Sequence, residues 1–324
     1  MTTDVLASET PTAPTSPARQ RRGGRRGDLG AVGLVLAAAV SVQFGSGVAA
    51  LLFPQAGAAG MVALRLSVAA VLMLALCRPR LRGRSRADWL AVAGLGLAFA
   101  GMNSVFYQAI DRIPLGPAVT LEVLGPLTLS IVTARRRGTW LWALVALAGV
   151  ALLGTGGIDR LNAPGVALAL VAGALWAAYI LLSASVGRRF TGADGLALAL
   201  GVAALLTLPV GIFSAGSALL DPVVLVLGAG VALLSSVLPY TFEMTALRRL
   251  PSSTFAIMMS LGPALACLAG FVVLGQPLNW LEGSAVLLVI TASAGAVHTG
   301  TATPPPTITA TPTARRRWRR GRAG

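Results

Sequence analysis

The stretch AIDRIPLGPAVTLEVLGP (Ala109–Pro126) recurs, shifted by 137 residues, as ALRRLPSSTFAIMMSLGP (Ala246–Pro263). Identical residues hold the two copies in register at Ala109/Ala246, Arg112/Arg249, Pro114/Pro251, Leu124/Leu261, Gly125/Gly262 and Pro126/Pro263. The register continues without a gap to Gly138/Gly275. Apolar sequence of low complexity often matches by composition alone, but turn prolines and a Gly-Pro pair are a more specific signal. We therefore predict an internal repeat.

Outside the repeat signal, arginines divide the chain into long apolar segments. All 26 basic residues are Arg, and 23 of them lie in six clusters: Arg19–Arg26, Arg78–Arg86, Arg135–Arg137, Arg188–Arg189, Arg248–Arg249 and Arg315–Arg322. Each interval between clusters is long enough for two membrane crossings of about 20 residues. Because basic loops mark the cytoplasmic side, this alternation predicts an all-α polytopic membrane protein with ten transmembrane helices and both termini in the cytoplasm.

The composition agrees with a membrane protein. Hydrophobic residues make up 55% of the chain and charged residues 11%, and the mean hydropathy is +0.77, which excludes an ordinary soluble domain. A net charge of +15 suggests a nucleic-acid partner only if it gathers on one face. Here the charge is spread over loops and tails, so we expect no nucleic-acid partner. Cys77 and Cys267 fall at different depths and are not expected to form a disulfide.

The expected helices alternate between basic loops and short loops with few basic residues. They cover 29–52, 58–77, 88–110, 115–134, 139–156, 164–187, 195–216, 222–247, 254–274 and 279–298. The first is longer than the apolar core of a signal peptide, about 7–15 residues, so it is expected to be a retained helix. The loops expected outside are Pro54–Gly57, Asp111–Pro114, Ile158–Ala163, Ser217–Asp221 and Gly275–Leu278. Residues 1–28 and 299–324 are Thr/Pro/Arg-rich and are expected to be disordered cytoplasmic tails.

Two repeats of five helices, at residues 29–157 and 158–298, must insert in opposite orientations because five is odd. The loop positions agree, since the turn at Arg112 is expected outside and its counterpart at Arg249 inside. Inverted repeats are the architecture of secondary transporters, in which the substrate site lies near the midplane between the repeats. The sequence therefore predicts alternating access.

Two charges fall inside predicted spans at similar depth. Arg65 lies in the second span and Glu122 in the fourth, each roughly 10 Å below the external surface at about 1.5 Å per residue. Charges within a membrane are costly and are candidate functional residues. Two interpretations stay open: a structural ion pair that locks the first repeat, or a site in which Arg65 holds a substrate carboxylate or Glu122 exchanges a proton or an ammonium group.

Other candidates lie nearby in the predicted bundle. Glu243 is five residues before Arg248, where a salt bridge or a gate contact at the cytoplasmic end is expected. Gly125-Pro126 and Gly262-Pro263 are expected to break the fourth and ninth helices, because proline removes a backbone hydrogen bond; the break serves either packing or a movement. The candidate cavity-lining residues, each alternatively an interhelical hydrogen bond or interfacial anchor, are Gln43, Asn103, Tyr107, Gln108, Trp176, Tyr179 and Tyr240.

At these residues the chain resembles ten-helix members of the drug/metabolite transporter superfamily that carry two EamA domains. The matching stretches cover both repeats and neither tail: LFPQAGAAGMVALRLSVAA (Leu52–Ala70), GMNSVFYQAI (Gly101–Ile110), PLGPAVTLEVLGPL (Pro114–Leu127), GALWAAYIL (Gly173–Leu181), LPYTFEMTALRRLP (Leu238–Pro251) and SLGPALACLAG (Ser260–Gly270). The resemblance implies proton-linked amino-acid efflux and a central cavity formed largely by spans one, three, four, six, eight and nine. Glu122 matches an acidic position of the family motif, whereas its repeat counterpart is Met259.

We thus expect a secondary exporter of small neutral amino acids such as threonine or homoserine in the cell membrane, with another metabolite or a hydrophobic drug as the alternative cargo. A membrane-embedded enzyme is disfavoured because the sequence has one His, no Lys and no paired acidic motif. A scaffold would gain nothing evident from an inverted repeat. No metal, phosphate-loop or cofactor motif is present, so the expected partners are a small-molecule substrate, the lipid bilayer and protons.

Overall fold

The computed structural model describes residues 21–134, 139–155, 162–247, 258–277 and 279–300. Within these ranges the chain is helical and contains no strand. Eight helices are long and apolar enough to cross a membrane, and two shorter apolar helices span Trp140–Leu153 and Gly262–Leu274. The all-α polytopic membrane fold is therefore confirmed.

The helices follow one another as α1 (Arg21–Leu51), α2 (Phe53–Cys77), α3 (Arg86–Ile110), α4 (Leu115–Glu122), α5 (Leu124–Ala134), α6 (Thr139–Thr155), α7 (Ala163–Gly187), α8 (Asp194–Ala215), η2 (Gly216–Leu220), α9 (Pro222–Ala232), η3 (Leu233–Val237), α10 (Leu238–Leu247), α12 (Gly262–Leu274) and α13 (Trp280–Gly300). The expected fourth span consists of α4 and α5. The expected eighth span consists of α9, η3 and α10, in which η3 is a short π-helical segment.

Several predicted boundaries are wrong. α1 begins at Arg21 and α13 ends at Gly300, so the segments 21–28 and 299–300 of the expected disordered tails are helical; residues 1–20 and 301–324 lie outside the described ranges. The expected loop Pro54–Gly57 is a helical turn at the start of α2, and a kink at Gly57, where φ and ψ are non-helical, separates it from the rest of that helix, which begins at the predicted residue 58. A proline in the first helical turn removes no needed hydrogen bond, and Gly57 absorbs the bend at φ 67°. The expected loop from Ser217 is mostly the 3₁₀ helix η2.

The ends of α3 and α7 agree with the predicted boundaries to within two residues. They place the described arginine loops at one end of the bundle. α3 begins with a capping box in which the Ser85 side chain accepts from the Asp88 backbone and Asp88 accepts from the Ser85 backbone. The Arg189 guanidinium, after α7, lies 3.3 Å from the Asp88 carboxylate. Hence the loops before α3 and after α7 meet at what we call the arginine end. The turn Asp111–Pro114 lies between α3 and α4, at the opposite end, where Arg112 pairs with Asp111 at 3.8 Å.

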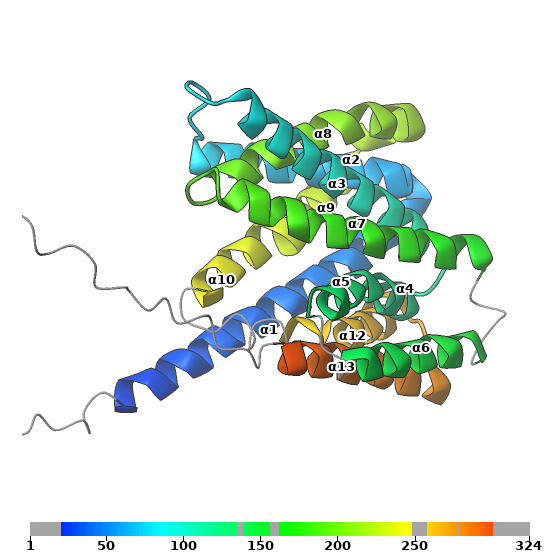
Figure 1. Ribbon diagram of the computed structural model, residues 1–324. Helices are drawn as coiled ribbons and strands as arrows, with labels where there is room; N and C mark the ends of the chain where they lie inside the picture. The colour runs from blue at the N-terminus through cyan, green and yellow to red at the C-terminus, as the bar shows by residue number, and fades with distance from the viewer. Residues whose placement is uncertain (1–20, 135–138, 156–161, 248–257, 278, 301–324) are drawn as a thin grey trace, which may run out of the picture.

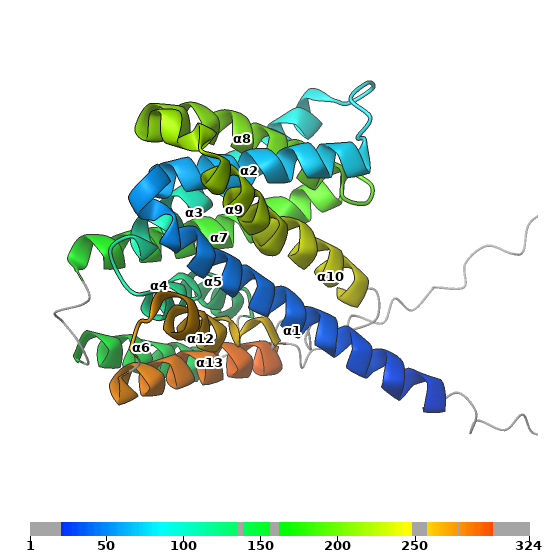
Figure 2. The same cartoon turned by 180° about the vertical axis from the view of Figure 1, so that it is seen from behind.

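Helices from the two halves of the chain pack against each other in pairs (Figure 1). α2 packs on α8, α3 on α7, α6 on α13, α1 on α10, and α4 on α12. Figure 2 shows the same arrangement from behind, with α2 and α8 on one side of the molecule and α6 and α13 on the other. If the first five spans are superposed in order on the last five, the pairs α2–α8, α4–α12 and α6–α13 each map onto themselves. The pair α1–α10 maps onto α3–α7.

Both expected proline breaks occur, slightly before the Gly-Pro pairs. The fourth span is interrupted at Val123, between α4 and α5, and α12 begins at Gly262 after a turn at Ser260 and Leu261. Pro126 cannot donate to the carbonyl four residues earlier, which is that of Glu122, and its ring crowds the same carbonyl. The break therefore starts at the residue that carries the buried carboxylate.

Candidate functional site

A cavity of about 670 Å³ lies between the two halves of the bundle. Side chains from α1, α3, α4, α5, α7, η3, α10, α12 and α13 line it, together with Arg65 from α2. These elements include every span that the family resemblance implied, plus the second and tenth. The sequence-predicted residues that line the cavity are Gln43, Arg65, Asn103, Glu122, Pro126, Trp176, Tyr179, Glu243 and Gly262.

The other predicted residues lie elsewhere. Tyr107 is fully buried behind Arg65, and Gln108 accepts a hydrogen bond from Arg112 at 2.7 Å. Gly125 packs on Gly173 of α7, with too little room for a β-carbon. Pro263 is buried in the first turn of α12. The side chain of Tyr240 and the whole of Arg248 fall outside the described part of the structure, so the expected contact of Glu243 with Arg248 does too.

The cavity extends toward the arginine end and is closed at the opposite end. Thr133, Glu243 and Val297 line it, and each lies within the last five residues of its helix at the arginine end. At the opposite end the space between helices is filled by buried apolar side chains of one cluster, among them Leu52, Phe53, Phe106, Tyr107, Ile110, Ile113 and Leu115. The structure is therefore accessible, along this path, from the arginine end.

Arg65 lies in the middle of α2, where its side chain is 7% exposed. Its Nη1 donates to the Tyr107 hydroxyl at 3.0 Å, its Nη2 to the Ser235 carbonyl at 3.0 Å, and its Nε to the Ser236 hydroxyl at 3.4 Å. The guanidinium carbon also lies 5.5 Å from the Tyr107 ring centre, within cation–π range. A guanidinium has five N–H donors, so these contacts leave two for another ligand.

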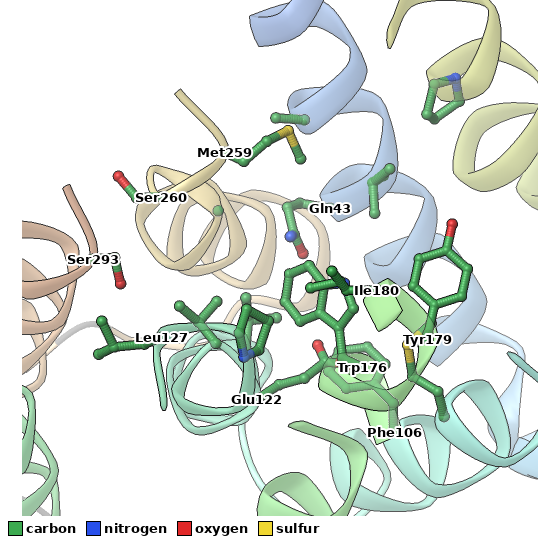
Figure 3. Close-up of a pocket in the computed structure, with 18 of the residues that line it drawn as sticks. Gln43, Phe106, Glu122, Leu127, Trp176, Tyr179, Ile180, Met259, Ser260 and Ser293 are labelled. Carbon is green, nitrogen blue, oxygen red and sulfur yellow. The ribbon is translucent and has the colours of Figure 1, made fainter. Parts of the chain in front are cut away.

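Glu122 is the last residue of α4 and is 9% exposed. Figure 3 shows its side chain extending toward Trp176. Across the described residues, ion pairs join Arg112 to Asp111 and Arg189 to Asp88, and none joins Arg65 to Glu122. The guanidinium of Arg65 and the carboxyl group of Glu122 therefore face one cavity without direct contact, and the structural ion pair that the sequence left open does not form.

Aromatic side chains form much of the remaining wall. Trp176, Tyr179, Phe99 and Phe106 line the cavity, and the Phe99 and Tyr179 rings meet edge to face at 5.4 Å. Gln43 faces Trp176 from α1 (Figure 3). Asn103 donates from Nδ2 to the Phe99 carbonyl at 2.8 Å, which leaves its amide oxygen as an acceptor. The site thus combines a guanidinium, a carboxyl group, amides and a large aromatic surface.

Sequence reasoning missed the lining residues Ser235 and Pro239 of the eighth span. A signal was present, because Pro239 lies inside the expected eighth span, 222–247, near the end of the apolar segment VALLSSVLPY. Ser293 and Ser260 also line the cavity. Single serines in apolar helices are common and carry no comparable signal.

Apolar helices of spanning length around a closed-ended cavity, with an arginine and a glutamate at mid depth, define a multi-pass membrane transporter. A model of the EamA-like transporter family matches residues 163–297. The threonine/homoserine exporter RhtA of Salmonella typhimurium strain LT2 is 39% identical over 268 residues, covering 82% of this chain and 90% of that protein. The threonine/homoserine exporter RhtA of Escherichia coli strain K12 gives the same identity and coverage.

A solved structure described as "Crystal structure of protein" superposes with a TM-score of 0.52 at 19% identity, covering 86% of this chain and 98% of that one. At this identity the likeness shows a shared fold alone. Taken with the identity to the exporters, these findings show that the chain belongs to the EamA-like transporter family, as a membrane exporter.

Proposed function

We propose that this protein is a secondary-active exporter of small neutral amino acids such as threonine or homoserine, and not an enzyme. One observation carries the proposal: Arg65 and Glu122 face the same cavity and do not pair with each other. A zwitterion brings the complementary charges, a carboxylate for Arg65 and an ammonium group for Glu122. The 39% identity to threonine/homoserine exporters supports this substrate class.

The residue roles follow from their contacts. The two remaining guanidinium N–H groups of Arg65 bind the substrate carboxylate, since arginine matches carboxylate geometry. Glu122 binds the ammonium group or carries the coupled proton. The Asn103 amide oxygen accepts a hydrogen bond from the substrate hydroxyl, and Trp176 and Tyr179 enclose the aliphatic part. Glu243 stands nearer the cavity entrance and takes part in gating.

The transport cycle rests on the proposed inverted repeats, residues 29–157 and 158–298. The pairing of α2 with α8, of α4 with α12, and of α6 with α13 supports them, because such pairs lie on the axis of a two-fold relation. Exchange of the two half-structures produces a second state that opens at the opposite end. With the arginine end in the cytoplasm, both termini are cytoplasmic and the described cavity faces inward. Export is proton-linked and needs no bound cofactor.

A second candidate is an exporter of a hydrophobic metabolite or drug. The aromatic wall favours it, and a cavity of about 670 Å³ falls in the range of about 300–1,000 Å³ typical of drug-sized ligands. Buried opposite charges are unnecessary for such a cargo, so the amino-acid proposal ranks first.

Reconstituted proteoliposomes test the proposal. Vesicles loaded with labelled threonine or homoserine should release label faster than protein-free vesicles, and a pH gradient should change the rate. Equal release from both kinds of vesicle across a panel of amino acids would refute the amino-acid substrate. Faster release that is unaffected by the gradient would refute proton coupling alone.

A further inference from the structure

The eighth span changes helix type beside Arg65. η3 is a π-helical turn over Leu233–Val237, in which the Leu238 backbone N–H donates to the Leu233 carbonyl, five residues back. Pro239 follows directly and has no N–H, so the carbonyl of Ser235 lacks its usual donor four residues ahead. Short π segments of this kind occur frequently at functional sites.

The first half of the chain uses the carbonyls released by this turn. The Leu234 carbonyl, whose regular α-helical donor Leu238 is committed to Leu233, accepts from the Ser41 hydroxyl of α1. The Ser235 carbonyl accepts from Arg65 Nη2 of α2 at 3.0 Å. Gly45 of α1 permits this approach, because a β-carbon there would lie 2.2 Å from the Ser235 hydroxyl oxygen.

We propose that Pro239 is a positioning residue for Arg65: by withholding a backbone donor from the Ser235 carbonyl, it supplies the acceptor that fixes the guanidinium at the cavity wall. The inference rests on the proposed function, in which Arg65 binds the substrate carboxylate. Tyr107 holds Nη1 and the Ser235 carbonyl holds Nη2, so the guanidinium plane is set from two sides. A charge-assisted bond to a carbonyl that lacks its regular α-helical donor compensates part of the cost of burying the arginine.

The inference predicts a defect confined to carboxylate recognition. Pro239→Ala restores an N–H that closes the regular helical bond onto the Ser235 carbonyl and removes the wide turn. The lost hydrogen bond to a charged group is equivalent to roughly a 10-fold loss of affinity for threonine. Binding of an amino alcohol with the ammonium and hydroxyl groups of threonine but no carboxylate should stay unchanged.

The control is Pro209→Ala, which removes the proline inside α8, at an exposed position away from the cavity. Binding of threonine and of the amino alcohol is measured on purified protein in detergent for wild type and both variants. The affinity for threonine divided by the affinity for the amino alcohol should fall in Pro239→Ala. It should stay at the wild-type value in Pro209→Ala. An unchanged ratio in Pro239→Ala, or an equal fall in both variants, would overturn the inference.

A second measurement needs no substrate and separates this inference from the proposed function. Arg65→Gln is made in wild type and in Pro239→Ala, and the Tm of each protein is recorded. The change in Tm caused by Arg65→Gln should be smaller in the Pro239→Ala background, because one acceptor is already withdrawn. An equal change in Tm from Arg65→Gln in the wild-type and Pro239→Ala backgrounds would overturn the positioning role of Pro239. If wild type binds no amino acid while the changes are non-additive, the proposed substrate falls and the positioning of Arg65 stands.

Discussion

The buried positive charge of Arg65 is hydrogen-bonded to neutral acceptors alone among the contacts that the structure describes. Its contacts are a phenol hydroxyl, a backbone carbonyl and a serine hydroxyl. Such contacts offset part of a desolvation cost of several kcal/mol, and a carboxylate offsets more. The described residues bring no carboxylate into ion-pair distance of it. A substrate carboxylate is therefore a favourable partner for this guanidinium.

We predict that Glu122→Gln and Arg65→Gln each abolish transport while the protein still inserts into the membrane, since each removes one charge that the zwitterion needs. Efflux from proteoliposomes measures activity, and membrane yield measures insertion. Glu282→Gln is the matched control, because Glu282 is also buried, 5% exposed, and lies outside the cavity. Normal transport by the double variant Arg65→Gln/Glu122→Gln would show that neither residue serves as a ligand or proton site.

Tyr107→Phe tests the other support of Arg65. The ring keeps its place against Phe53 and Phe106, and the hydroxyl that accepts from Nη1 disappears. Hydrogen bonds to charged groups contribute about 1.5–3 kcal/mol, so we expect a lower Tm in detergent and a higher KM for threonine. An unchanged KM would mean that Tyr107 stabilises the fold without orienting the guanidinium.

At the scale of elements, the break in the fourth span is held by contact between two backbones. A β-carbon on Gly125 would lie 1.8 Å from the Gly173 carbonyl oxygen, and one on Gly173 would lie 2.5 Å from the Glu122 carbonyl oxygen. The matching glycine of the second half of the chain, Gly262, would meet only the Gln43 amide, at 3.7 Å. The two halves thus carry the same Gly-Pro pair in different surroundings.

This difference yields a prediction with an internal control. Gly125→Ala must push α5 away from α7, and such overpacking costs typically about 1–3 kcal/mol. We expect a clear loss of Tm and of transport, because Glu122 is displaced with the helix. Gly262→Ala meets only a movable side chain, and we expect a Tm close to wild type. Equal Tm values for the two variants would contradict the close packing at Gly125.

At the scale of the whole molecule, packing between the halves leaves one cavity open toward the arginine end. The apolar cluster that contains Phe53, Tyr107 and Leu115 closes the other end. Since Arg65 and Glu122 line the cavity beneath this closed end, the proposed function has substrate reach both side chains from the arginine end. Opening of the opposite end requires separation of helices that now bury this cluster.

The orientation is tested with single cysteines after Cys77 and Cys267, both free thiols, are replaced by serine. We predict that Asp111→Cys reacts with a membrane-impermeant maleimide on intact cells, whereas Arg80→Cys reacts only after permeabilisation. Both positions are exposed, at opposite ends of the bundle. The reverse labelling pattern would place the arginine end outside and would make the described cavity outward-facing.

Much of the fold follows from residue patterns along the chain. Arginine clusters and apolar lengths predicted the spans, since lipid requires long apolar helices between charged loops. The residues before Gly57 form a helical turn where a loop was predicted, because Pro fits a first helical turn, whereas the predicted start of the second span at residue 58 coincides with the kink at Gly57. Prolines at 126 and 263 marked the helix breaks to within a few residues, because the missing donor acts on the preceding turn.

By itself the sequence determined the class of protein, and it predicted the number of spans and the depth of Arg65 and Glu122 in the membrane. Depth comes from counting residues along a helix axis, but it does not say which way a side chain points around that axis. Only the tertiary structure decided that Arg65 turns toward Tyr107 and the Ser235 carbonyl. The direction of the Arg65 side chain depends on a segment 170 residues away in the chain, the π turn that Pro239 follows. The hydrogen-bond partners of a buried side chain in a packed bundle are set by which helices meet, and that is a property of the tertiary structure.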